Sequence, residues 1–128
     1  MKIQTEISIG ELLDKASILK IKSEKISDIN KKISIDKELI YLNKIISDLL
    51  KEYPLAEKRT QELVAINSKL WEIEDQIREK ERDKTFDDEF IELARSVYYT
   101  NDQRFEIKNK INQESGSSFL EQKSYEKY

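Results

Sequence analysis

The sequence predicts an all-α fold, an antiparallel bundle of about four helices in which a short helical hairpin packs on a longer one. The 128 residues include only two glycines and one proline, whereas turn-rich β-folds need more of both. Charged residues make up 38% of the chain, and the apolar residues between them recur at helical spacing. The length suits one modest core, so we expect residues 1–128 to form a single helical domain.

The first strong helix signal lies at Ser8 to Glu11. A serine followed three residues later by a glutamate forms a capping box, which satisfies free amides at the start of a helix. The seven residues before it alternate weakly, so we expect an extended arm there. Apolar residues then follow at helical spacing as far as Ile26. We therefore expect a first helix that ends near Ser27-Asp28 and contacts more than one neighbour.

A second helix is expected over about Ile33–Glu52, with Ser34 and the acidic residues after it as the start signal. Its apolar side chains are separated by steps of four and three residues, the pattern of a seam between two helices: Ile35, Leu39, Leu42, Ile46 and Leu49. Tyr53-Pro54 is the clearest break in the chain. Proline disfavours helical geometry in the residue before it and suits the first turn of the next helix.

The last two helices are expected to be longer than the first two. The third should cover about Leu55–Arg82, and the fourth should start from an N-cap within residues 85–88 and run to about Glu114. Gly116 is then a natural C-cap. At 1.5 Å per residue these helices would span roughly 40 Å, against about 30 Å for the first two. The polar tail, residues 117–128, is expected to be loosely ordered.

Composition narrows the possible chemistry. The chain contains no cysteine and no histidine, which excludes a thiolate nucleophile, a disulfide framework and the commonest metal ligands and general bases. An enzyme of this composition would have to use Asp, Glu, Lys, Arg, Tyr or Ser. We therefore favour a non-enzymatic role while leaving enzymatic activity open, and we expect no cofactor and no metal.

Charge and hydropathy patterning bear on partners and location. The net charge is −3, and the 23 basic and 26 acidic residues are spread along the whole chain. Nucleic-acid binders usually gather Lys and Arg on one face, so we expect no nucleic-acid partner. The start of the chain does not have the pattern of a signal peptide, and no apolar run approaches the roughly 20 residues of a membrane span. We expect a cytoplasmic protein without a membrane partner.

Two pairs of carboxylates raise the question of magnesium. The spacings Glu72-x-x-Asp75 and Glu89-x-x-Glu92 resemble those with which all-α nucleotide pyrophosphohydrolases hold the ion, and divalent cations do prefer several oxygen ligands. The apolar seam of the third helix, however, places Asp75 on the opposite side. We therefore expect these carboxylates to lie on a solvated face.

The most interesting candidate is a polar interruption of the fourth helix between Tyr98 and Arg104. Continuing the apolar stripe from Val97 brings Thr100, Asn101 and Arg104 onto the core side. Such groups need partners, because an unpaired buried polar group costs about 1–3 kcal/mol. We favour an internal polar network that fixes how the helices pack. The alternative is a ligand-binding site made of Tyr98, Asn101, Asp102 and Arg104 with Glu11 and Asp14 of the first helix.

Antiparallel hairpins also predict contacts between neighbouring helices. If the chain turns near residues 83–84, Asn101 lies opposite Asn67, and Arg95 lies near enough to Glu74 to pair with it. In the first hairpin, Lys22 is placed to pair with Glu38.

Four stretches of the sequence resemble a known family. They are SIGELLDKASILKIKSEKI, LWEIEDQIREKE, FIELARSVYYTNDQRFEIKNKIN and EQKSY. Together they are similar to a family of small bacterial and bacteriophage proteins known as domain of unknown function 6165. The resemblance covers almost the whole chain, and its most specific part is Val97-Tyr98 with Asn101-Asp102 and Arg104. It implies no activity.

Two hypotheses about function follow from the sequence. The leading one is a non-enzymatic helical interaction module that binds a protein partner or a second copy of the chain, because long helices with apolar seams dominate the sequence. The alternative is a protein or enzyme that binds a nucleotide, phosphate or dicarboxylate through the polar segment of the fourth helix.

Overall fold

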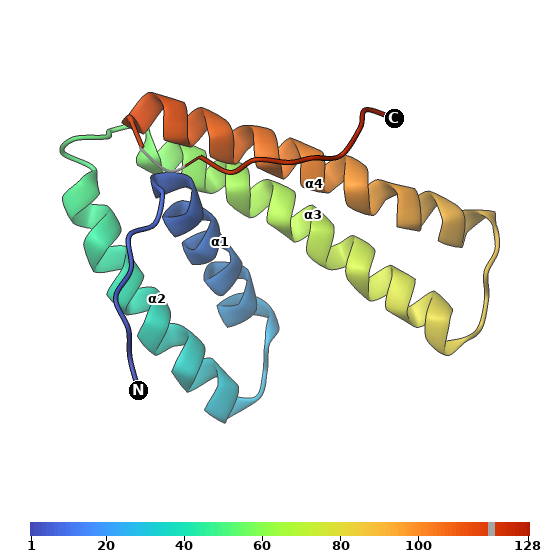
Figure 1. Ribbon diagram of the computed structural model, residues 1–128. Coiled ribbons are helices and arrows are strands. Elements are labelled where there is room, and N and C mark those ends of the chain that lie inside the picture. Colours follow the sequence, from blue (N-terminus) through green and yellow to red (C-terminus); the bar gives the residue numbers. More distant parts are fainter. Residues whose placement is uncertain (118–119) are drawn as a thin grey trace.

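The computed structural model describes residues 1–117 and 120–128, and all regular structure within them is helical. The elements are α1 (Ile9–Lys25), α2 (Ile29–Leu49), α3 (Ala56–Arg82) and α4 (Asp88–Ser115). Figure 1 shows that α1 and α2 form a short hairpin and that α3 and α4 form a longer one. The predicted all-α arrangement of a short hairpin packed on a longer one is thus confirmed.

The start of α1 follows the predicted capping signal in part. Ser8 is the N-cap, and its hydroxyl accepts a hydrogen bond from the Glu11 amide at 3.1 Å. The Glu11 carboxylate, in contrast, forms an ion pair with Lys108 of α4. The helix ends at its C-cap Ile26, close to the predicted position. The serine therefore caps α1, while the glutamate links α1 to α4.

The predicted start of the second helix is wrong. α2 begins at Ile29, because Asp28 acts as its N-cap and accepts from the Lys31 amide at 2.9 Å. A connection as short as residues 26–28 is enough to join the two helices, so the C-cap of α1, Ile26, lies only two residues before the N-cap of α2, Asp28. At its other end α2 stops at Leu49 and the chain turns before Pro54.

The two longer helices begin and end close to the predicted positions. α3 starts at Ala56, just after the Tyr53-Pro54 break. Asp87 is the N-cap of α4 and accepts from the Phe90 amide at 3.0 Å. Gly116 ends α4 in the left-handed conformation, with φ 69°. These boundaries are predictable because each rests on a local signal, namely a proline, a capping aspartate or a glycine.

The core lies where α1 crosses the longer hairpin. One buried cluster joins α1, the α2–α3 connection, α3 and α4: Leu13, Tyr53, Ala56, Leu63 and Ile111. A second lies between α1 and α2: Leu12, Ala16, Leu19 and Leu42. Eight of the 17 residues of α1 are buried, but only Leu42 is buried among the 21 residues of α2. α1 is therefore the central helix, and α2 packs mainly on α1.

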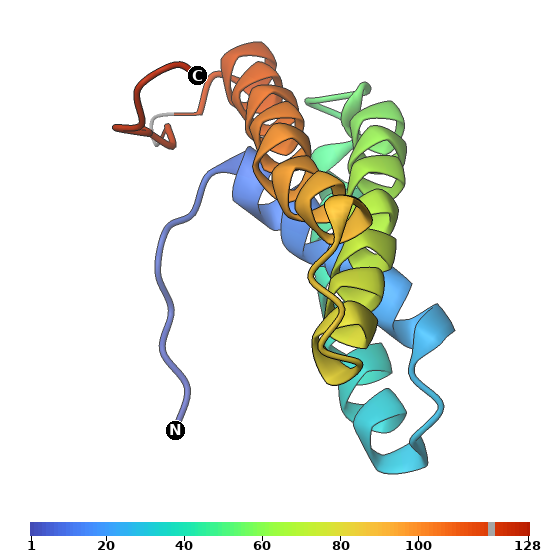
Figure 2. The same cartoon turned by 90° about the vertical axis from the view of Figure 1, so that its right-hand side faces the viewer.

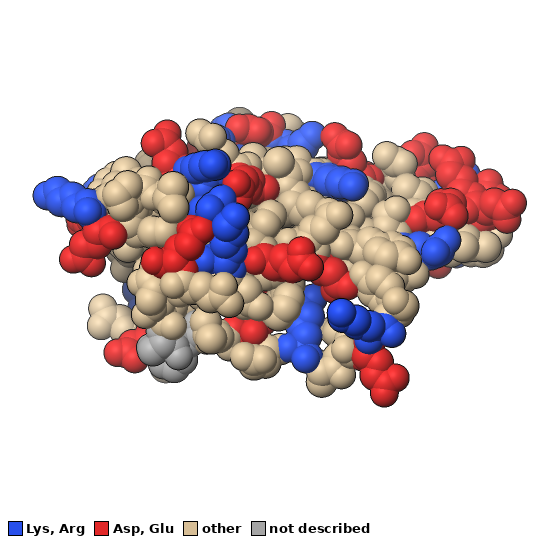
Figure 3. Space-filling model, turned by 90° about the horizontal axis from the view of Figure 1, so that it is seen from above, with Lys and Arg blue, Asp and Glu red and all other residues tan. Residues whose placement is uncertain are grey.

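The longer hairpin projects beyond the crossing. In Figures 1 and 2 the end of α3 and the start of α4 extend away from the first hairpin and have only each other as helical neighbours. Seen from above, acidic side chains gather at this projecting end, while both signs of charge mix over the rest of that face (Figure 3). The N-terminal arm, residues 1–7, is exposed and has no regular structure.

The C-terminal tail returns along α4. The hydroxyl of Tyr128 donates to the Asp102 carboxylate at 2.5 Å, and Lys123 lies 3.5 Å from the same carboxylate. The Lys123 ammonium also lies 5.0 Å from the centre of the Phe105 ring. These contacts cover one side of α4 with residues 120–128.

Among the described helices, none combines the length and apolar character needed to span a membrane.

Candidate functional site

A buried polar network joins α1, α3 and α4 at the crossing. Asp14 of α1 is 3% exposed, and its Oδ1 accepts from Arg104 Nε at 2.9 Å and from Asn67 Nδ2 at 2.9 Å. Its Oδ2 accepts from Arg104 Nη2. Asn67 Nδ2 donates its second proton to the Ser17 hydroxyl at 2.8 Å, and that hydroxyl donates to the Asp14 carbonyl at 2.6 Å. Each helix at the crossing thus contributes to one closed set of bonds.

The electrostatics of this network favour the charged form of Arg104. The hydrogen bond to Asp14 is the main reason that the pKa of Arg104 lies above its ordinary value, although partial burial opposes the charged form. A bidentate guanidinium–carboxylate pair is among the stronger polar contacts in proteins. Because both oxygens of Asp14 are engaged, the carboxylate is a structural acceptor. Within this network, Asn67 Oδ1 and Arg104 Nη1 have no hydrogen-bond partner among the described residues.

One turn further along α4, Lys108 forms a second link to α1. Its side chain is 8% exposed, and its ammonium lies 2.7 Å from Glu11 Oε1 and 2.8 Å from Glu121 Oε2. Burial alone would lower the pKa of Lys108, but the bonds to the two carboxylates outweigh it and raise that pKa. Lys108 therefore ties both the start of α1 and the C-terminal tail to α4.

The first turn of α1 lies unusually close to α4. The Gly10 amide donates to Asn112 Oδ1 at 2.7 Å, and Asn112 is 1% exposed. A Cβ at Gly10 would lie 2.8 Å from Asn112 Oδ1 and 2.8 Å from the Lys108 carbonyl oxygen. Only glycine fits without displacing the α4 backbone. The one sequence signal for this contact is a glycine inside the first turn of a helix.

A third polar cluster lies at the far end of α4. Both oxygens of Glu114 accept from Arg59 of α3, at 2.6 and 3.1 Å, and Tyr53 Oη donates to Glu114 at 2.6 Å. Arg59 also pairs with Glu62. The bonds from Arg59 and then Tyr53 lower the pKa of Glu114 to about 2, whereas burial and the Glu114 carboxylate raise the pKa of Tyr53. Arg59 lies on the buried stripe of α3 between Ala56 and Leu63, but Ala56 alone before it is too small an apolar residue to mark the stripe there, so the sequence gives only a weak signal for this cluster.

The structure does not bring the six predicted site residues together. Arg104 and Asp14 are direct partners, and Glu11 joins the same side of α4 through Lys108. Asp102 faces the tail instead, where it contacts Tyr128 and Lys123. Tyr98 also lies there, with its ring 5.2 Å from that of Tyr128.

Two further polar residues of the interruption differ in burial. The predicted core position Thr100 is 2% exposed. Asn101 is only half-buried, and its side chain has no hydrogen bond within the described residues. The polar segment of α4 therefore serves two faces, one toward α1 and one toward the tail.

Neither the Arg95–Glu74 nor the Lys22–Glu38 ion pair forms among the described residues, and Asn67 and Asn101 share no hydrogen bond. The partners found are Asp14 and Ser17 for Asn67, Glu92 for Arg95, Arg78 for Glu74, and Lys15 for Glu38. At the crossing α1 lies against both α3 and α4. Its polar side chains bind residues of α3 and α4, and these residues therefore do not pair with each other. In the projecting part of the long hairpin, Glu74–Arg78 and Glu92–Arg95 pair within their own helices, whereas Lys80 of α3 pairs with Asp87 and Glu89 at the start of α4.

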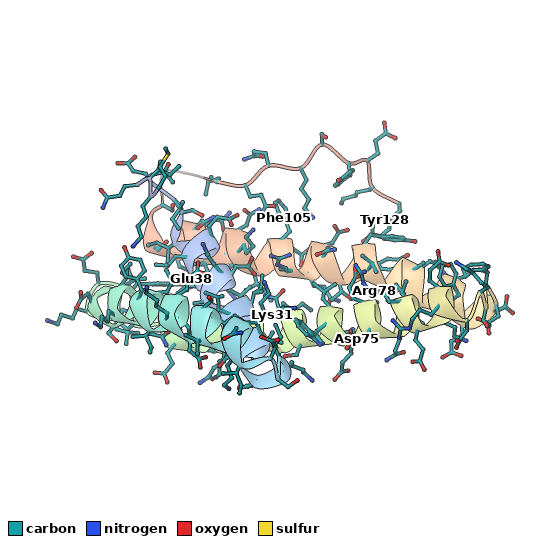
Figure 4. All side chains as sticks on the ribbon, turned by 90° about the horizontal axis from the view of Figure 1, so that it is seen from below. Lys31, Glu38, Asp75, Arg78, Phe105 and Tyr128 are labelled. Atoms are coloured by element: carbon teal, nitrogen blue, oxygen red, sulfur yellow. The ribbon has the colours of Figure 1, made fainter. Side chains whose placement is uncertain are left out.

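An open pocket of about 440 Å³ lies in the angle between the two hairpins. Its apolar walls come from α1 and α3: Ile18, Ile21, Leu70 and Trp71. The polar and charged residues that line it are Lys22, Asn67, Glu74, Asp75, Arg78 and Arg104. Figure 4 shows Asp75 and Arg78 on the stretch of α3 that emerges beyond the first hairpin. The buried network thus forms part of the pocket surface.

The carboxylates considered for magnesium lie at exposed positions. Glu72, Asp75, Glu89 and Glu92 are all exposed, and Glu89 and Glu92 take part in ion pairs with Lys80 and Arg95. Asp75 lies at the rim of the pocket together with Glu74. The described residues contain no cluster of three or more potential ligands for a metal ion.

Comparison with known proteins gives one match. No curated protein matches the chain, and no solved structure does. A family model, described as a family of unknown function, matches residues 1–128. The match includes all four stretches on which the resemblance was based, with the polar segment of α4 among them. The chain therefore belongs to the family of unknown function DUF6165.

Proposed function

We propose that this protein is a non-enzymatic helical interaction module that binds a helix of its partner on the outer face of α2, and that the first partner to test is a second copy of the chain. One observation carries the proposal. α2 packs mainly on α1, yet its opposite face carries a stripe of exposed isoleucines.

The outer face of α2 carries three exposed isoleucines. Ile29, Ile33 and Ile40 are 75%, 62% and 58% exposed. At 100° per residue they fall within one narrow stripe, on a different side from the residues that pack on α1. Full burial of one isoleucine contributes about 1.5–3 kcal/mol, so covering this stripe is a substantial driving force for association.

A second copy is the simplest occupant of this stripe. Two-fold symmetric contacts use the same surface on both copies, and an apolar helix stripe is complementary to itself. Two such helices pack at an interaxial distance of about 8–10 Å, which this face can accommodate because no other described helix covers it.

The test is sedimentation equilibrium of the wild type and of the double variant Ile33→Glu/Ile40→Glu. We expect a reversible monomer–dimer equilibrium for the wild type and a dimer dissociation constant at least about tenfold higher for the variant, since two buried charges oppose association. Ile91→Glu is the matched control, because Ile91 of α4 is 52% exposed and lies on the other hairpin. It should leave the equilibrium unchanged.

Two outcomes would count against the proposal. A wild type that stays monomeric at all concentrations would exclude self-association. An interaction module as such would be excluded if, in addition, no partner captured by the protein is lost with the Ile33→Glu/Ile40→Glu variant and kept with Ile91→Glu. Circular dichroism of each variant establishes that the helices remain folded.

A further inference from the structure

We infer that the pocket between the two hairpins binds a small zwitterion with an apolar side chain, in the size range of an amino acid or a dipeptide. This inference is independent of the proposed function, because the pocket lies between α1, α3 and α4 and does not include the outer face of α2.

The size and walls of the pocket suit such a ligand. Its volume of about 440 Å³ falls within the range of ligand sites, about 300–1,000 Å³. Trp71 and Leu70 of α3 face this space together with Ile18 of α1. An apolar side chain in contact with them would be removed from water on several sides, and this burial supplies the hydrophobic part of the affinity.

The floor of the pocket offers one free acceptor and one free donor. Asn67 is 6% exposed, and both protons of its Nδ2 are used by Asp14 and Ser17, so its Oδ1 remains an acceptor. Arg104 uses Nε and Nη2 to bind Asp14, which leaves Nη1 as a donor. Both residues line the pocket. The network holds these two atoms in place, so a ligand would meet groups that are already positioned.

The rim carries one unpaired charge of each sign. Lys22 of α1 and Asp75 of α3 both line the pocket, and neither has an ion-pair partner in the described part of the chain. Arg78 and Glu74, in contrast, pair with each other at 3.5 Å. A carboxylate would find Lys22 and Arg104, and an ammonium group would find Asp75 and Asn67 Oδ1.

The mixed charge also decides between ligand classes. A nucleotide or a dicarboxylate would bring two or more negative charges close to Glu74 and Asp75, whereas Arg78 and Arg104 are already paired with Glu74 and Asp14 and leave Lys22 as the one unpaired cation of the pocket among the described residues. A ligand with a single positive charge would be disfavoured in the same way by the basic residues of the pocket. A zwitterion satisfies both signs at once, which is why we expect it to bind better than either singly charged analogue.

The experiment uses three compounds that share a phenyl ring. They are L-phenylalanine, 3-phenylpropanoate, which lacks the ammonium group, and phenethylamine, which lacks the carboxylate. Trp71 is the only tryptophan of the chain and lines the pocket, so its fluorescence reports binding directly. We expect a saturable change with L-phenylalanine at about millimolar concentration, as the ligand is small and the pocket open. Each analogue should bind about fivefold more weakly.

Two variants separate the charges. Lys22→Gln should weaken binding of L-phenylalanine and 3-phenylpropanoate about fivefold but should not weaken binding of phenethylamine. Asp75→Asn should weaken binding of L-phenylalanine and phenethylamine about fivefold but should not weaken binding of 3-phenylpropanoate. Lys20→Gln is the matched control, since it removes the same charge from an exposed position of α1 outside the pocket. Equal binding of all three compounds, or the same effect of Lys22→Gln and Lys20→Gln, would overturn the inference. So would the absence of any saturable fluorescence change together with unchanged amide shifts around Asn67 in NMR spectra.

Discussion

Asp14 is the residue on which three helices depend. It is almost fully buried, and its two oxygens bind Arg104 of α4 and Asn67 of α3. A charge in this position is tolerated only because its partners replace the water that it has lost. The same bonds fix the positions of Arg104 and Asn67 in the pocket surface.

We predict that Asp14→Ala lowers the free energy of unfolding by about 3–5 kcal/mol, because it leaves the Arg104 guanidinium partly buried without its counter-ion. The double variant Asp14→Leu/Arg104→Met should be less destabilised than Asp14→Leu alone, since no uncompensated charge remains. Urea denaturation of the wild type, Asp14→Leu, Arg104→Met and the double variant measures this coupling.

The exposed pair Glu92–Arg95 is the control for that cycle. Its atoms lie 3.5 Å apart on the surface of α4, so removing it should change the free energy of unfolding by less than about 0.5 kcal/mol. Strictly additive effects of the Asp14 and Arg104 substitutions would show that the two side chains do not act together.

Sequence reasoning found some of these residues and missed others for a physical reason. Arg104 and Thr100 were recognisable because polar residues interrupt an apolar stripe. Periodicity states which face of a helix a residue occupies, but it does not identify the helix that meets that face. Asp102 was therefore grouped with Arg104, although Asp102 contacts the C-terminal tail and Arg104 contacts α1. Arg59 and Glu114 were missed because each lies at the end of the apolar stripe of its helix, where a charged residue is typical of a solvated helix end.

At the scale of the helices, boundaries with a local signal were predictable. The break at Tyr53-Pro54, the cap before α4 and the end at Gly116 all depend on residues within a few positions of the boundary. The start of α2 was misplaced because two capping signals, at Asp28 and Ser34, lie within two turns of each other. Which of them is used depends on where α2 meets α1, and this is a tertiary contact.

The close approach of α1 to α4 leads to a prediction about Gly10. We predict that Gly10→Ala destabilises the protein by about 1–3 kcal/mol, because the new methyl group would collide with the Lys108 carbonyl and with the Asn112 side chain. A thermal melt should show a decrease of several degrees in Tm.

Gly116 provides the comparison for this variant. A Cβ at Gly116 would meet nothing within 4 Å, so Gly116→Ala would carry only the cost of the left-handed backbone, about 1 kcal/mol. Hydrogen exchange distinguishes the two effects, since only Gly10→Ala should reduce protection of the first turn of α1. Unchanged protection there would mean that α1 and α4 are less closely packed than the structure shows.

In the molecule as a whole, the Tyr53–Arg59–Glu114 cluster joins the α2–α3 connection to the end of the long hairpin. Its carboxylate leads to a prediction about acid. Glu114 has an ordinary pKa of 4.5 and a pKa of about 2 in the folded protein. A carboxyl whose pKa is depressed by folding stabilises the protein above its unfolded pKa, and this contribution is lost as the pH falls toward the folded value.

We predict that Glu114→Gln lowers the free energy of unfolding by about 1–2 kcal/mol at neutral pH and by almost nothing near pH 2. The full shift corresponds to roughly 3 kcal/mol, but the side chain is 23% exposed and solvent screens part of the interaction. Urea denaturation at several pH values between about 2 and 7 measures the difference between the two proteins.

Glu57→Gln serves as the control, because Glu57 is exposed on the first turn of α3. Its difference from the wild type should stay below about 0.5 kcal/mol over the same range, because Glu57 is exposed and forms no ion pair among the described residues. A constant difference between Glu114→Gln and the wild type from neutral pH to pH 2 would contradict the assignment of this acid sensitivity to Glu114.

The projecting end of the α3–α4 hairpin has a consequence for the dynamics of the molecule. Its helices have a neighbour on one side only, so opening this end exposes little apolar surface and leaves the crossing intact. The hairpin is held at the crossing, and its far end, where α3 turns into α4, has no contact with the first hairpin. We expect bending of this far end on a time scale faster than global unfolding, and the pocket lies near the crossing, where such bending would first change the shape of the site.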